Sequence, residues 1–150
     1  MGDRDERKVS LVLLTIEKVV ILKSVKIFSE TPDEYLVDVA NILKEVHAKA
    51  GQEIFKKGDI GTAMYIIVEG KVRVHDETRE FAVLRDPDVF GELSALDPEP
   101  RSATATAIED THLFCLEGDA LFELMAENIE VARGIIHVLC QRMRVRSQNL

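Results

Sequence analysis

The sequence has little cysteine and lacks tryptophan. Its 150 residues include two cysteines, Cys115 and Cys140, and no tryptophan. Both cysteines lie in apolar runs, so we expect buried thiols in a reducing compartment rather than a disulfide framework. No secretory signal is visible, and the first apolar run, residues 9–22, is shorter than the roughly 20 residues that span a bilayer. We therefore expect a cytoplasmic chain, or one on the cytoplasmic face of a membrane protein, without membrane insertion of its own.

Positive charge is also scarce. The chain has 19 Lys and Arg against 27 Asp and Glu, which gives a formal net charge of −8. Sequence-independent nucleic-acid binding needs clustered basic residues, so we expect no nucleic-acid partner. The last twenty residues are the exception, with four arginines and no acid. They either complement a helix dipole or contact an acidic partner or membrane surface.

The apolar pattern changes period along the chain and predicts an α+β protein. Residues 8–23 show helical spacing, and a second helix is expected from Thr31, as N-cap, to near Lys44. Short β-rich runs separated by glycines follow up to residue 116, which is typical of an antiparallel sandwich or barrel. A short helix from Gly118 and a longer one after Asn128 complete the pattern. We expect an antiparallel β-roll, jelly-roll-like, flanked by N-terminal helices and two C-terminal helices.

One segment, residues 88–104, carries a chemical pattern. Phe90 is predicted to end a strand, Gly91 permits a tight backbone approach, and residues 92–96 can form one helical turn whose N-terminus suits an anion. Arg101 follows, and an arginine facing such a turn makes a phosphate cradle. Glu92 would repel a phosphate, so we expect it to accept hydrogen bonds from hydroxyl groups. A ribose beside a phosphate meets both demands.

These residues resemble the phosphate-binding cassette of cyclic nucleotide-binding domains. The matching stretches are Phe-Gly-Glu-Leu-Ser at 90–94 and Arg-Ser-Ala-Thr at 101–104, preceded by Gly-Asp-Ile-Gly at 58–61 and Gly70. The resemblance implies a cyclic nucleotide-binding domain over residues 31–150, with an N-terminal helical extension over residues 1–30. Two departures, Ala95 for a larger aliphatic residue and Phe55 for a smaller residue, are expected to alter packing without removing a ligand contact.

The resemblance also implies roles for individual residues. Arg101 would pair with the cyclic phosphate, and Glu92 would accept from the ribose 2′-hydroxyl. Backbone N–H groups would complete the ligand site, contributed by Gly91, Leu93, Ser94 and Ser102. The ligand would be cyclic AMP or cyclic GMP, with no further cofactor, and Ser102 is compatible with either; we favour cyclic AMP.

A regulatory switch is implied as well. In this family the nucleotide shifts the packing of the C-terminal helices against the β-roll, so the domain would act as a sensor. Leu93 resembles the cassette leucine that packs on the hinge helix, where Phe122 is the expected partner. The apolar stripe of the first predicted helix is wider than one face needs, which suggests a homodimer contact or fusion to a larger protein.

Two alternatives remain. The first is a degenerate β-roll that binds no nucleotide and serves as an interaction module of a larger membrane-associated or helical-repeat protein. The second is a cupin-type metal enzyme, which needs clustered histidine and carboxylate ligands. The four histidines are isolated in the sequence, at His47, His75, His112 and His137. No catalytic triad, cysteine–histidine or paired-carboxylate pattern is legible, so we expect no metal, no catalytic residue and no enzyme activity.

Overall fold

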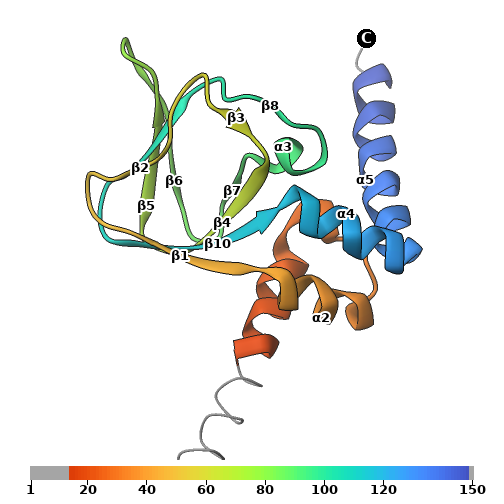
Figure 1. Ribbon diagram of the computed structural model, residues 1–150. Helices are drawn as coiled ribbons and strands as arrows, with labels where there is room; N and C mark the ends of the chain where they lie inside the picture. The colour runs from red at the N-terminus through yellow and green to blue at the C-terminus, as the bar shows by residue number, and fades with distance from the viewer. Residues whose placement is uncertain (1–13, 149–150) are drawn as a thin grey trace, which may run out of the picture. The chain divides into compact units, whose positions relative to one another are not determined.

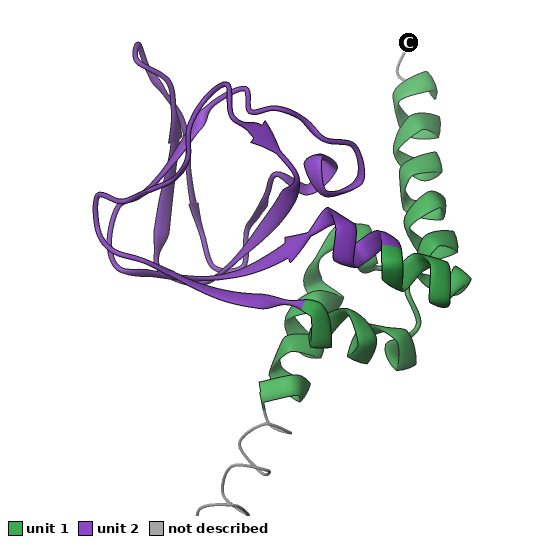
Figure 2. Cartoon of the chain, viewed as in Figure 1, with its two compact units in different colours: residues 1–42, 123–150 green, residues 43–122 purple. Residues whose placement is uncertain are grey.

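The structure is a computed structural model that describes residues 14–148. The chain divides into two compact units, one of residues 1–42 and 123–150 and one of residues 43–122 (Figure 2). The expected boundary between an extension at 1–30 and a domain from residue 31 stays a prediction. Within residues 14–148, no helix combines the length and the apolar character needed to cross a bilayer.

The first unit is helical. Residues 14–24 form a helix, and the first six residues of the predicted helix 8–23 lie outside the described part. The remaining elements are η1 (Lys26–Phe28), α2 (Asp33–Ile42), the end of α4 (Gly118–Glu127) and α5 (Ile129–Gln148). Gly134 lets α5 approach the turn before α2, since a Cβ there would lie 3.0 Å from the Thr31 hydroxyl oxygen.

The start of α2 differs from the prediction. The carbonyl of Pro32 accepts hydrogen bonds from the N–H groups of Tyr35 (3.0 Å) and Leu36 (3.2 Å). Pro32 therefore occupies the capping position, and the predicted cap at Thr31 is wrong. The Thr31 hydroxyl is buried and has no hydrogen-bond partner among the residues that the structure describes. The helix also ends before Lys44, which begins the first strand.

The second unit is an antiparallel β-roll (Figure 1). Its first sheet has the strand order β1-β10-β4-β7, its second has β2-β9-β5-β6, and the short strands β3 and β8 pair separately. The predicted α+β class and jelly-roll-like topology are confirmed. The strand bounds are β1 Lys44–Ala48, β2 Glu53–Phe55, β3 Ile60–Gly61, β4 Ala63–Glu69, β5 Lys71–His75, β6 Glu80–Arg85, β7 Val89–Phe90, β8 Glu99–Pro100, β9 Thr104–Ala107 and β10 Thr111–Glu117.

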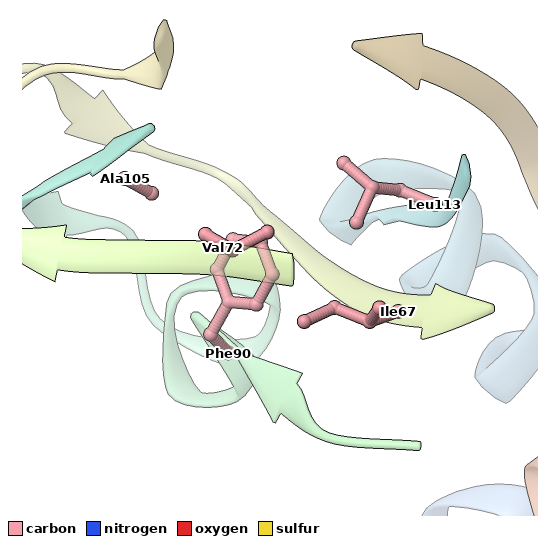
Figure 3. Close-up of a cluster of buried hydrophobic side chains, with 5 residues drawn as sticks. All are labelled: Ile67, Val72, Phe90, Ala105 and Leu113. Atoms are coloured by element: carbon pink, nitrogen blue, oxygen red, sulfur yellow. The ribbon is translucent and has the colours of Figure 1, made fainter. Parts of the chain in front are cut away.

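A cluster of apolar side chains lies between the two sheets. Ile67, Phe90 and Leu113 come from the first sheet, while Val72 and Ala105 come from the second (Figure 3). None of the five is more than 7% exposed. Because alternate residues of a strand point to opposite faces, the short apolar runs of the sequence suffice to line this core.

The segment after β7 follows the predicted course. Gly91 adopts a left-handed conformation (φ 73°), and α3 spans Glu92–Leu96, with Asp97 after it. The chain then forms β8, which the sequence did not predict. Beyond β8, the N–H of Arg101 donates to the carbonyl of Asp59 (2.7 Å), and its carbonyl accepts from Gly58 (2.8 Å). These two bonds fasten the arginine to the glycine-rich loop before β3.

Candidate functional site

Arg101 is the most unusual side chain of the second unit. It is a charged residue with only 8% exposure, whereas arginines rarely lie fully buried without a partner. Its Nη2 donates a hydrogen bond to the carbonyl of Ala63 at 2.7 Å. The guanidinium carbon lies 4.1 Å from the centre of the Phe55 ring, in cation–π geometry. One face of the guanidinium is therefore held by an aromatic ring and one edge by the backbone.

Two glycines make room for this guanidinium. A methyl group at Gly61 would overlap Arg101 Nε, and one at Gly91 would overlap Nη1. Gly91 also has a positive φ, which residues with a Cβ atom adopt only at a cost in free energy. Both glycines belong to the motifs singled out in the sequence, and the structure shows what they do: they let the backbone close around a cation.

The Phe55 ring that contacts Arg101 belongs to a cluster of three aromatic side chains. The rings of Phe55, Tyr65 and Phe90 contact one another, with centroid distances of 5.3–6.0 Å. From the sequence we expect Phe55 only to alter packing. Its ring also lines the cavity in front of Arg101. Burial raises the pKa of Tyr65 to about 12, so its phenol stays neutral and does not neutralise the arginine.

The charge of Arg101 is not balanced by an ion pair. No carboxylate among residues 14–148 lies within 4.0 Å of its guanidinium, and its Nε has no hydrogen-bond partner in that part of the chain. Burial lowers the pKa of the guanidinium, and the charges of nearby acidic groups, the carboxylates of Asp59 and Glu117 among them, offset part of that shift. An arginine nevertheless remains protonated in proteins. The result is a desolvated cation with a free donor, which is the arrangement that binds an anion strongly.

A cavity of about 240 Å³ opens in front of the arginine. Four of the predicted ligand residues line it: Gly91, Ser94, Arg101 and Ser102. The other lining residues were not predicted, and they are Phe55, Val74, Phe90, Glu99, Pro100 and Ala103. The aromatic character of Phe55 and Phe90 was visible in the sequence, but nothing there indicated which way their rings point.

The other predicted residues lie nearby but not around this cavity. Glu92 and Leu93, the first residues of α3, are not among its lining residues. Leu93 is 57% exposed and Phe122 is 49% exposed, so their expected contact stays a prediction. The N–H of Ser94 donates to the carbonyl of Gly91 at 3.1 Å. A ligand at that N–H would have to share this bond.

Two of the histidines that are isolated in the sequence lie side by side in the structure. His47 and His112 are paired across β1 and β10, and their rings stack with centroids 4.4 Å apart. Glu45 lies beside them. Sequence distance concealed this cluster, because strand pairing brings together residues that are far apart in the chain.

Comparison with known proteins matches the chain to one family. The model of the cyclic nucleotide-binding domain matches residues 45–128. A CRP-like cAMP-activated global transcriptional regulator of Mycobacterium tuberculosis is 31% identical over 135 residues, covering 87% of this chain and 60% of the relative. The human cyclic nucleotide-gated channel alpha-3 is 38% identical over 122 residues, covering 76% of this chain and 18% of the channel. This chain thus spans less than two thirds of either relative.

A solved structure shares the fold. The N-terminal domain of a transcriptional regulator from Streptomyces coelicolor A3(2) superimposes with a TM-score of 0.82 and 29% identity, covering 86% of this chain and 94% of that one. The relatives named are regulators and a channel. The matched segment runs from the second residue of β1 to just beyond the end of α4, and it contains Arg101 with its glycines, its aromatic ring and its cavity. The chain therefore belongs to the cyclic nucleotide-binding domain family.

Proposed function

We propose that the chain binds cyclic AMP at the cavity in front of Arg101 and acts as a regulatory sensor. The observation that carries the proposal is the buried, unpaired guanidinium, held by Ala63 and Phe55 and enclosed by two glycines. Its partner has to be an anion that fits a small cavity and brings its own hydrogen-bond acceptors, since carboxylates of the chain do not supply them. A cyclic phosphate has this chemistry.

We propose cyclic AMP rather than cyclic GMP as the ligand. Ser102 lines the cavity, and its hydroxyl can donate to a phosphate oxygen or meet the 2-amino group of a guanine. No further acceptor specific for guanine is evident in the sequence. The mycobacterial relative is named as cAMP-activated, which supports the same choice. A tenfold tighter affinity for cyclic GMP, equal to about 1.4 kcal/mol, would overturn it.

The proposal assigns the ribose to Glu92. This residue begins α3, next to Gly91 at the edge of the cavity. Its carboxylate would accept from the 2′-hydroxyl, so Glu92→Gln should weaken binding modestly and reduce discrimination against a 2′-deoxy cyclic nucleotide. Equal discrimination before and after the substitution would remove Glu92 from the ribose site.

The sensor role requires the C-terminal helices to respond to the ligand. We propose that Leu93 and Phe122 belong to this response, since both present large apolar surface to solvent in this state. Hydrogen exchange over residues 118–148 should change in wild type when nucleotide binds, and the change should shrink in Phe122→Ala at saturating nucleotide. Protection that changes only at residues 90–104 would leave a binding domain without a helical switch.

The direct test of the binding function is calorimetry with cyclic AMP, cyclic GMP and 5′-AMP. We expect 1:1 binding of a cyclic nucleotide and much weaker binding of 5′-AMP, whose dianionic open phosphate is larger. If none of the three nucleotides binds, the result favours the alternative, a degenerate β-roll that serves as an interaction module.

A further inference from the structure

A second cluster of polar side chains lies on the outer face of the first sheet. His47 of β1 is directly opposite His112 of β10 in the antiparallel register. Glu45 precedes His47 by two residues in the same strand, so the two side chains share a face. The two imidazole rings are stacked at 4.4 Å with an interplanar angle of 14°. One nitrogen of each histidine and one Glu45 oxygen all lie within 4.8 Å of one another.

The ring of His112 is not satisfied by the protein around it. Its Nε2 is buried, and it makes no hydrogen bond to any of residues 14–148. The nearest carboxylate oxygen, Oε1 of Glu45, is 3.6 Å away, which is beyond hydrogen-bond distance. The edge of the His112 ring packs on Phe114, so an apolar side chain limits its movement on one side. A buried nitrogen held near a carboxylate without bonding to it calls for a third group between them.

An ordinary ion pair accounts for only part of this arrangement. The contact of His112 with Glu45 at 3.6 Å does not account for the stacking of His47 on the same ring. Metal ions bind imidazole through a ring nitrogen, and each of the two rings brings one such nitrogen to the cluster. Two imidazoles and one carboxylate thus supply three potential metal ligands on one face of the sheet.

The surroundings also favour a cation. The cluster borders a cavity of about 400 Å³, whose lining includes the carboxylates of Glu69 and Asp110 beside one lysine, Lys49. Glu69 is the strand partner of His112 on β4. Asp110 accepts a hydrogen bond from the N–H of Ala50 at 3.0 Å, which orients it. This cavity shares no lining residue with the cavity at Arg101.

We propose that Glu45, His47 and His112 form a binding site for a divalent transition-metal ion of the zinc type. Two imidazoles and a carboxylate are a ligand set that Zn²⁺ prefers. With bonds of about 2.0–2.1 Å, tetrahedral ligand atoms lie about 3.3 Å apart, so the 3.6 Å between Glu45 and His112 is already close. The stacked rings have to tilt toward each other to converge. Water would complete the coordination.

The ion would link two neighbouring strands. β1 is the edge strand of its sheet and pairs only with β10 among the described strands. Metal ligands on both strands would tie this edge to the sheet, and metal binding would then stabilise the folded protein by mass action. This inference does not depend on nucleotide binding, because the two cavities are separate.

The test is calorimetric titration of Zn²⁺ into tag-free protein, in a buffer without phosphate or chelators. His137 and Cys140 are three residues apart on α5 and offer two further potential Zn²⁺ ligands, so the parent for this test carries His137→Gln and Cys140→Ser. We expect the parent to bind one Zn²⁺. We expect His47→Gln and His112→Gln to weaken binding roughly tenfold or more, and Glu45→Gln to weaken it less. Mg²⁺ should not bind there.

The matched control is His75→Gln. His75 lies in β5 of the other sheet and hydrogen-bonds to Thr106 through Nε2 at 2.8 Å, so its loss should leave the affinity for Zn²⁺ unchanged. Circular dichroism checks that each variant folds. If a variant does not fold, the imidazole NMR signals of His47 and His112 in the parent still report on the site, because they should shift with Zn²⁺. The proposal is overturned if the parent binds no Zn²⁺, if the two histidine variants bind it as the parent does, or if those signals do not move.

Discussion

The Arg101 cavity and the cluster of Glu45, His47 and His112 lie in the same unit, yet they are assembled differently. The cavity is built largely from one stretch of chain around α3, and its central charge is 8% exposed. The cluster joins two strands distant in sequence, and its side chains are 25% (His112) and 43% (Glu45) exposed. Sequence motifs revealed the first site, while only strand register revealed the second.

The difference shows which kind of site can be predicted from a sequence. At Arg101, backbone requirements select unusual residues, such as a glycine with positive φ, and these stand at fixed spacing. In the cluster, each residue is an ordinary member of the outer face of a strand. A slip of one residue between β1 and β10 would send the two histidines to opposite faces of the sheet.

Replacing the central cation should have the largest effect. Arg101→Met should weaken cyclic nucleotide binding by roughly 30-fold to several thousand-fold, since truncating one member of a buried charge pair costs about 2–5 kcal/mol. Without nucleotide, the free energy of unfolding should change by less than about 1 kcal/mol, because the relieved desolvation offsets the lost bond to Ala63. Calorimetry and urea unfolding measure the two quantities.

A matched control for Arg101→Met is Arg79→Met. Arg79 also lies over an aromatic ring, that of Phe81, at 4.7 Å, but Phe81 is 44% exposed. Arg79→Met should leave nucleotide affinity unchanged, and so should His112→Gln. If Arg101→Met and Arg79→Met bind nucleotide equally well, the buried arginine is not the anion site.

Substituting the glycines around the guanidinium should have the next largest effect on nucleotide affinity. Gly61→Ala places a methyl group against Arg101 Nε without a positive φ, and Gly91→Ala adds backbone strain to an overlap with Nη1. Both should weaken nucleotide binding by roughly tenfold or more, because a displaced charge binds the phosphate less well. Gly91→Ala should also lower the free energy of unfolding by about 1 kcal/mol or more.

Gly58→Ala is the control for backbone strain. Gly58 has a positive φ of 93°, but a Cβ there meets nothing within 4 Å. This variant should lose stability as Gly91→Ala does and keep its nucleotide affinity. An equal loss of affinity in Gly58→Ala and Gly61→Ala would assign the effect to the loop as a whole rather than to the space around Arg101.

Removing the aromatic ring under the guanidinium should have a smaller effect. Phe55→Leu keeps most of the apolar volume but abolishes the cation–π contact at 4.1 Å, which is worth about 0.5–2 kcal/mol. We expect nucleotide affinity to fall by a few-fold to about 30-fold. Phe81→Leu removes the contact under Arg79 and should have no effect on binding; a parallel loss in both variants would contradict the role given to Phe55.

The smallest effect concerns pH. The pKa of Tyr65 in the folded protein is about 12, against 10.0 for an ordinary tyrosine. Between these values the unfolded chain has lost the phenolic proton and the folded chain has kept it, so stability falls as pH rises above about 10. Tyr65→Phe should remove this part of the decline, as followed by urea unfolding between pH 9 and roughly 11. An unchanged decline would place Tyr65 in a more hydrated setting.

Much of the fold was predictable because its signals are local. The short β-rich runs before residue 116 predicted the strands of the β-roll, and the stretch after Gly91 predicted α3 with the same bounds. The errors are also local in origin. Thr31 is a good capping residue, but Pro32 accepts the first helical hydrogen bonds instead, and β8 consists of only two residues, Glu99 and Pro100, with no strand pattern.

The order of residues was sufficient to single out Arg101 and the turn after Gly91, because glycines, a short helix and an arginine at this spacing constrain the backbone itself. Two things depended on the tertiary structure. One is the aromatic ring of Phe55 beneath Arg101, since the direction of a side chain follows from the packing of two sheets. The other is the meeting of His47 with His112, since register between distant strands is set by the burial of their opposite faces.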